Sequence, residues 1–133
     1  MALEGREIQI YGDGTQIRDF VYVDDACDAF LRAGFDDATN GGVFNVGGSE
    51  PIAHRELVAL LLEASGRGTM RFVEWPEETR RIDIGSFYSD STRMTTTTGW
   101  TPMVTLRSGL AATLSYYQTH FDRYVESPEP TFA

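Results

Sequence analysis

Lysine is missing from these 133 residues, in which all eleven basic side chains are arginine. A phosphate-binding P-loop needs its lysine and Schiff-base chemistry needs an amine, so the sequence carries neither. It has one cysteine, Cys27, and two histidines, His54 and His120. A single cysteine excludes an internal disulfide, and the three side chains make a poor zinc set, so we expect no metal site.

Positive charge and long apolar runs are also scarce. Acidic residues outnumber basic ones by twenty to eleven, which gives a net charge of −9. This balance argues against a nucleic-acid partner, although a small anionic ligand needs only one or two arginines. We find no signal peptide and no apolar run that could span a bilayer. The sequence therefore predicts a cytoplasmic location and no membrane partner.

The length suits one domain, and the order of segments predicts an α/β fold without internal repeats. We expect β-type segments at residues 7–11, 20–23, 43–46 and 70–73, and helices at 25–35, 54–65 and 106–121. Asp24, Ala53 and Thr105 are the expected N-caps. Residues 77–90 are expected to be irregular, and the four threonines at 95–98 to form only a weak turn. The domain is expected to span 1–125, with 126–133 as a frayed tail.

One arginine stands out in YGDGTQIRDFVYVDD, residues 11–25. Arg18 follows a glycine turn that could fix its direction, and its guanidinium offers a planar fork of donors that suits phosphate. The alternative is a surface arginine paired with Asp19 or Asp24. The local residues leave both interpretations open.

A second candidate is the pair Arg80-Arg81 followed by Asp83. Two arginines and a carboxylate in a loop could clamp a diphosphate and hold a ribose hydroxyl. The alternative is solvated charge that offsets Glu77 and Glu78. Neither arginine site is specific when taken alone.

Three other residues have structural interpretations. Asn45 lies among apolar residues in VFNVGG, where an unbonded amide would cost about 1–3 kcal/mol, so we expect it to bond to neighbouring backbone. Cys27 is expected to be a core thiol. Tyr11 is expected to be a core or interface aromatic. The Gly47-Gly48 pair is expected to form a turn rather than a phosphate cradle.

Four segments taken in order are more specific: YGDGTQIRDFVYVDDACDAFL, GGVFNVGGSEPIAHRELV, TRRIDIGSFYSDSTRMTTTTGWTP and LRSGLAATLSYY. Together they resemble the C-terminal, substrate-binding part of extended short-chain dehydrogenases, the NAD-dependent nucleotide-sugar epimerases and dehydratases. The resemblance covers about residues 3 to 121. It implies a small βαβα substrate-binding portion that lacks the N-terminal Rossmann dinucleotide-binding half.

The resemblance also implies roles for five residues. Arg18 would contact the diphosphate of a nucleotide sugar, and Arg80 matches the arginine of the family's R-P-G-D element. Asp83 would contact the ribose, although the Pro-Gly of that element is here Arg81-Ile82. Asn45 would lie near the substrate. Tyr11 ends a strand whose main chain would lie beside the base.

The family's catalytic Tyr-x-x-x-Lys pair and its glycine-rich NAD-binding turn are absent from this sequence. The chain is therefore interpreted as a nucleotide-sugar-binding half that has no catalytic residue and binds no cofactor alone, NAD being the cofactor of the full-length family. One alternative is an enzyme part completed by a separate NAD-binding chain. Another is an oligomeric interaction module without a ligand. We expect an exposed strand edge at VFNVGG and an exposed apolar face on the preceding helix to favour a homo-oligomer.

Overall fold

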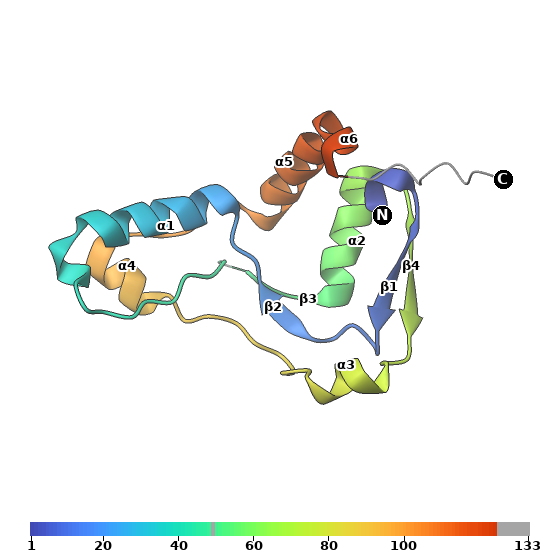
Figure 1. Ribbon diagram of the computed structural model, residues 1–133, viewed down its shortest axis with the longest axis horizontal. Helices are drawn as coiled ribbons and strands as arrows, with labels where there is room; N and C mark the ends of the chain where they lie inside the picture. Colours follow the sequence, from blue (N-terminus) through green and yellow to red (C-terminus); the bar gives the residue numbers. More distant parts are fainter. Residues whose placement is uncertain (49, 125–133) are drawn as a thin grey trace.

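The computed structural model describes residues 1–48 and 50–124. Two short sheets and their helices form an elongated molecule, in which α1 and α4 lie at one end and β1, β4, α2 and α5 at the other (Figure 1). The elements are η1 (Ala2–Glu4), β1 (Glu7–Tyr11), β2 (Ile17–Asp19), α1 (Val23–Phe35), η2 (Asp37–Thr39), β3 (Pro51–Ala53), α2 (His54–Ser65), β4 (Thr69–Val73), α3 (Glu77–Arg81), α4 (Thr92–Thr98), α5 (Leu106–Thr119) and α6 (Phe121–Tyr124). The mixed α/β class expected from the sequence is confirmed.

The first sheet pairs β1 with β4 in parallel, and Tyr11 lies opposite Val73 at its end. Helix α2 contacts both strands, and Ile10 of β1 is buried. The predicted bounds of α2 are confirmed. Its weak N-cap, Ala53, is helped by Glu56, whose carboxylate accepts a hydrogen bond from the Ala53 backbone N–H at 3.3 Å.

The second sheet pairs β2 with β3 in antiparallel fashion over three residues each. The ladder ends where Asp19 faces Pro51, because proline has no backbone N–H to donate. The β-type segment predicted at 20–23 is therefore wrong: the strand lies earlier, and the chain enters α1 at Val23. Strand β3 itself was not predicted.

Helix α1 begins one residue before the predicted cap. Tyr22 is the N-cap and makes no side-chain capping bond. Asp24 lies inside the first turn, where the helix dipole favours its negative charge. Asp25 is buried, and its carboxylate accepts hydrogen bonds from the backbone N–H groups of Met103 at 3.0 Å and Val104 at 2.9 Å. The start of α1 is thereby joined to the segment that leads into α5.

The core beside α1 forms around Trp100, which is fully buried and packs with Ala29 and Met94. The Trp100 indole N–H donates to the backbone carbonyl of Asp25 at 3.0 Å. Cys27 was predicted to be a core thiol, and this is wrong because its side chain is exposed. Only Asp25 and Ala29 of α1 are buried, so the helix contacts this core along a narrow face.

The outer face of α1 carries large apolar side chains. Phe30 is 79% exposed, Leu31 59% and Phe35 87%. The exposed apolar face expected on this helix is thus present. Apolar groups of this size in water are a feature of surfaces that associate with other chains.

Two expectations near α4 are wrong. Residues 43–46 join no strand in the part of the chain that the structure describes; instead Arg93 Nη1 donates to the Val43 carbonyl at 3.1 Å. The threonines at 95–98 belong to a helix rather than a weak turn. The hydroxyls of Thr96 and Thr98 donate to carbonyls four residues back, and Met94 anchors the helix in the core.

Charged end residues favour α3, and an N-cap fixes the start of α5. Residues 77–81, expected to be irregular, form α3, with Glu77 in the first turn and Arg81 in the last, as the dipole favours. The cap predicted for α5 is confirmed, since Thr105 Oγ1 accepts from the Ser108 backbone N–H at 3.2 Å. The tail predicted at 126–133 lies outside the described residues. Among the described residues, no helix combines the length and apolarity needed to cross a bilayer.

Gly47 and Gly48 allow two segments to pass at close range. A Cβ on Gly47 would overlap the carboxylate of Asp19, and one on Gly48 would overlap the carbonyl of Phe20. The Gly47 backbone N–H donates to Ser91 Oγ at 3.0 Å. Residues 47–48 can pass this close to the end of β2 only because neither has a side chain.

Replacing Asp25 tests the link between α1 and α5. Asp25→Asn leaves one of the two part-buried N–H groups without a good acceptor. We therefore expect a loss of about 1–3 kcal/mol in the free energy of unfolding, measured by urea denaturation. Asp24→Asn is the matched control, because Asp24 is exposed and should change stability by less than about 1 kcal/mol. Equal effects of the two changes would contradict this role for Asp25.

Replacing Gly48 tests the close passage. Gly48→Ala places a methyl group against the Phe20 carbonyl, and we expect it to lower the free energy of unfolding by about 1–3 kcal/mol. In Gly34→Ala the added methyl meets no neighbour, and in a helix it should be neutral or stabilising by up to about 1 kcal/mol. A thermal melt of both variants gives the comparison, and an unchanged Gly48→Ala melt would argue against the close passage.

Candidate functional site

Arg18 lies on β2 and is half-buried. One end of its guanidinium, Nη1, donates to the carbonyls of Ile17 at 2.7 Å and Gly85 at 2.6 Å. Among the described residues it forms no ion pair, so the pairing with Asp19 or Asp24 weighed above is not made. The donors on Nη2 and Nε therefore have no protein acceptor in the described part of the chain, and can meet a ligand.

The turn before β2 is fixed by its own hydrogen bonds. Gly12 has a φ of 67°, in the left-handed region that favours glycine. Thr15 donates to Asp13 Oδ1 through its hydroxyl at 2.6 Å and its backbone N–H at 3.0 Å. The Thr15 hydroxyl, and then its backbone N–H, hold the pKa of Asp13 below its usual value. The chain thus enters β2 in a defined direction.

A hollow of about 680 Å³ opens beside Arg18. The polar side chains of Gln16, Arg18 and His54 line part of it, and the aromatic side chains of Tyr11 and Trp75 line another part. The Arg18 guanidinium is held by carbonyl bonds and lines a cavity that has both polar and aromatic walls. These are the features of an anion site for a ligand that also has an apolar or aromatic part.

The residues of the second candidate separate in the structure. Asp83 lines the hollow beside Arg18 and accepts a hydrogen bond from Gln16 Nε2 at 2.7 Å. Arg80 lines an adjoining hollow of about 560 Å³, of which Trp75 and Asp83 also form part of the wall. Arg81 lines neither hollow. It pairs with Glu77, as expected if its charge only offsets that of the nearby glutamates. The two predicted arginines therefore approach a common wall from two different hollows.

Asn45 lies away from both hollows. Its side chain is exposed and makes no hydrogen bond within the described residues, so the expected bond to neighbouring backbone is not formed. The exposure removes the desolvation cost on which that expectation rested, because water can satisfy the amide.

The lining residues that the sequence did not single out as binding residues include Gln16, His54 and Trp75. Gln16 and His54 meet because the His54 backbone N–H donates to the Gln16 carbonyl at 3.0 Å, beyond the β2–β3 ladder. No local pattern connects them, since β3 was not predicted. Trp75 did give a signal, because it follows the strand predicted at 70–73 by two residues. The structure pairs this strand with the one that ends at Tyr11.

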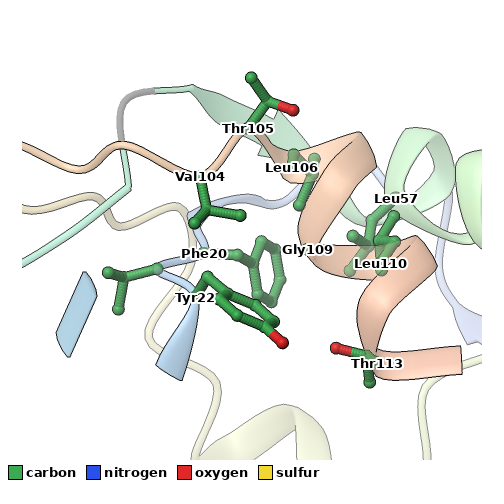
Figure 2. A pocket seen from close by; sticks show the side chains of 10 residues that line it. Phe20, Tyr22, Leu57, Val104, Thr105, Leu106, Gly109, Leu110 and Thr113 are labelled. Carbon is green, nitrogen blue, oxygen red and sulfur yellow. The ribbon is translucent and has the colours of Figure 1, made fainter. Parts of the chain in front are cut away.

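A third cavity of about 310 Å³ adjoins the Arg18 hollow through Phe20 and Leu57 (Figure 2). The rings of Phe20 and Tyr22 face α5, where Gly109 makes room: a Cβ there would be 3.0 Å from the Tyr22 ring. No charged side chain lines this cavity. It gives an anion no partner, so the candidate site is the hollow beside Arg18.

The described residues do not fit a dinucleotide. An NAD pyrophosphate is held where a glycine turn links a strand to the N-terminus of a helix. Here the glycine turn after β1 leads to β2, and β4 is followed by Glu74-Trp75-Pro76. Neither strand of the parallel pair ends in such a turn.

Comparisons with known proteins find similar sequences among nucleotide-sugar enzymes. The model of the NAD dependent epimerase/dehydratase family matches residues 1–47. A dTDP-glucose 4,6-dehydratase of Streptomyces griseus is 35% identical over 122 residues, which are 90% of this chain and 36% of that protein. A UDP-glucose 4-epimerase of Mycolicibacterium smegmatis is 38% identical over 116 residues, 87% of this chain and 36% of that protein.

Over most of its own length, the chain is therefore similar to NAD-dependent epimerases and dehydratases.

Solved structures of such enzymes show the same fold. A UDP-glucuronic acid 4-epimerase from Bacillus cereus, in complex with UDP-glucuronic acid and NAD, is 30% identical with a TM-score of 0.75, over 89% of this chain and 37% of its own. A UDP-glucose 4-epimerase from Thermotoga maritima, with UDP-glucose, is 31% identical with a TM-score of 0.74, over 91% of this chain and 38% of its own. The fold of this chain is thus similar to part of these extended short-chain dehydrogenases. The chain spans 36% of the length of the two curated relatives above.

Proposed function

We propose that this chain binds the nucleoside diphosphate moiety of a nucleotide sugar in the hollow beside Arg18. The observation that carries the proposal is the Arg18 guanidinium, fixed at one end by the Ile17 and Gly85 carbonyls while its other donors have no acceptor among the described residues. An arginine held in this way loses little side-chain entropy when it binds phosphate. Its bonds to a diphosphate are charge-assisted, and so are stronger than neutral ones.

The neighbouring residues supply the other contacts. Asp83 is oriented by Gln16 and can accept hydrogen bonds from ribose hydroxyls. Tyr11 ends β1 and forms part of the wall where a base would lie. Arg80 reaches the same wall from the adjoining hollow, whereas Asn45, which was expected near the substrate, lines neither hollow. We assign the main charge contact to Arg18 and a secondary one to Arg80.

The relatives support this class of ligand. The Bacillus cereus enzyme is described with UDP-glucuronic acid, and the Thermotoga maritima enzyme with UDP-glucose. Both are nucleoside diphosphate sugars, which combine a base, a diphosphate and a sugar. The hollow beside Arg18 offers a surface for each of the first two parts.

We propose further that these 133 residues do not catalyse a reaction alone. A Tyr-x-x-x-Lys pair needs a lysine, and this sequence has none. The family's redox chemistry also needs NAD, for which the described residues form no glycine turn. Residues on another part of the protein, or on a separate chain, would have to supply both.

Arg18→Ala tests the binding proposal. A ligand that binds only the folded state raises the midpoint of a thermal melt. We expect UDP, dTDP or GDP, or one of their sugars, to raise the midpoint of the 133-residue chain, and NAD not to do so. Arg18→Ala should weaken binding by about 10- to 150-fold, because charged hydrogen bonds contribute about 1.5–3 kcal/mol.

The control for this experiment is Arg107→Ala. Arg107 is an exposed arginine that pairs with Glu63 at 3.1 Å and lines neither hollow. Its replacement should leave the ligand-dependent rise intact. The midpoint of each variant without ligand reports any loss of folding separately. A nucleotide-dependent rise that persists in Arg18→Ala would contradict the proposed site.

A second candidate function, an oligomeric interaction module, is favoured by the outer face of α1. Phe30, Leu31 and Phe35 lie on this face with more than half of each side chain exposed. Association of two copies through these side chains would remove them from water, at about 25 cal/mol per Å² of apolar surface buried. This function does not exclude the first, because α1 and the Arg18 hollow lie in different parts of the molecule (Figure 1).

Phe30→Glu tests association through α1. We expect the chain to form homo-oligomers at tens of micromolar, and Phe30→Glu to shift them towards monomer because it places a charge in the interface. Light scattering coupled to size-exclusion chromatography measures the change. Met103→Glu is the control, since Met103 is 80% exposed but lies outside α1. A monodisperse wild-type monomer would count against the oligomer.

A further inference from the structure

Trp75 occupies the wall between the two hollows. It lies two residues beyond the end of β4, just before Pro76, the N-cap of α3. Its side chain lines the hollow that contains Arg18 and also the hollow that contains Arg80. A ligand bound beside either arginine therefore has access to the indole.

The indole is held in place by its neighbours. β1 and β4 pair in register up to Tyr11 and Val73, and the Gly12 backbone N–H donates to the Val73 carbonyl at 2.8 Å. A Cβ on Gly12 would lie 2.5 Å from Trp75 Nε1, so the indole packs directly against the glycine backbone. The Tyr11 ring lies beside it, tilted by 40°, with its centroid 5.4 Å from that of Trp75. The aromatic surface is thus formed before any ligand binds.

Such a surface recognises a chemical group that Arg18 cannot. A guanidinium binds the diphosphate equally well whatever is attached to it, whereas an indole offers a large π surface on which a nucleobase can stack. The protein also places Asp83, the candidate ribose contact, in both hollows beside the indole. Base, ribose and diphosphate contacts then follow one another along a single wall.

We propose that Trp75, supported by Tyr11 and Gly12, is the residue that recognises the nucleobase. The inference rests on the proposed function and adds that the ligand is selected as a nucleoside diphosphate, rather than as any pyrophosphate or sugar phosphate. Stacking on one base contributes about 1–3 kcal/mol, so the base should increase affinity by about 5- to 150-fold. Trp75 is the source of that increase.

The test compares UDP with inorganic pyrophosphate by isothermal titration calorimetry on the 133-residue chain. Wild type should bind UDP about 5- to 150-fold more tightly than pyrophosphate. Trp75→Ala should remove most of that difference by weakening UDP alone, and Trp75→Phe should restore much of it because phenylalanine still stacks. Tyr116→Ala is the control: Tyr116 is an exposed aromatic of α5 that lines neither hollow, and its loss should change neither affinity.

Tryptophan fluorescence gives an independent readout. The sequence has two tryptophans, and Trp100 is fully buried in the core beside α1. UDP should therefore quench the emission of Trp75, and the quenching should disappear in Trp75→Phe while UDP still binds. ADP and dTDP as further titrants show whether the surface prefers a purine or a pyrimidine.

The outcomes separate the two proposals. If Trp75→Ala weakens UDP and pyrophosphate equally, the indole acts on the shape of the site and the inference is wrong. If Trp75→Ala leaves UDP affinity unchanged, the inference is also wrong, while the Arg18 proposal stands. If wild type binds pyrophosphate and UDP with equal affinity, the base adds nothing to binding and the inference is wrong, while Arg18 still binds the anion. Failure of wild type to bind either ligand would overturn both proposals.

Discussion

The two hydrogen bonds accepted by the buried Asp25 carboxylate join parts of the chain that are far apart in sequence. They hold the Met103 and Val104 backbone against the first turn of α1, while the Asp25 carbonyl accepts from the Trp100 indole. This arrangement fixes where α5 begins, and with it the contact of Gly109 with Tyr22. Tyr22 lies only a few residues beyond β2, so the same link limits where the strand that carries Arg18 can lie. The strength of the link comes from the burial of Asp25, because a buried carboxylate must be compensated by hydrogen bonds.

The Arg18 hollow is a meeting point of segments rather than the product of one motif. Strand β2 supplies Arg18, α2 supplies His54, the loop after β4 supplies Trp75 and the segment after α3 supplies Asp83. The β2–β3 ladder is too short to hold these together, since it ends at Pro51. Hydrogen bonds from the 85–89 segment complete it: the Phe87 backbone N–H donates to the Ile17 carbonyl at 3.0 Å, and the Ser86 hydroxyl accepts from the Ile17 N–H at 3.1 Å. A ligand on Arg18 would thus lie close to the 85–89 segment. This segment was expected to be irregular and is held in place by its contacts with β2.

Sequence reasoning succeeded where local signals agreed and failed where distant contacts decided the outcome. For α2, the apolar spacing, Glu56 near its start and Gly66 after its end all favour the same bounds, and these are the bounds observed. For α4, four β-branched residues argued against a helix, but their hydroxyls bond back to the helix and Met94 is drawn into the core. The resemblance assigned Arg18, and the structure adds the two carbonyls that hold it. His54 and Gln16 could not be predicted as neighbours, because their proximity depends on a strand whose paired residues are 32 to 36 positions away in sequence.

The small amount of buried apolar surface has a thermodynamic consequence. Among the described residues six apolar side chains are buried, while eighteen large ones are exposed. The heat-capacity change of unfolding arises from apolar surface that becomes hydrated, and a typical domain gains about 12–15 cal/mol/K per residue. This chain hides less of that surface in its monomeric fold, so its heat-capacity increment should fall below that range. Its stability should then vary little with temperature, and its melting should extend over a wide interval rather than a sharp one.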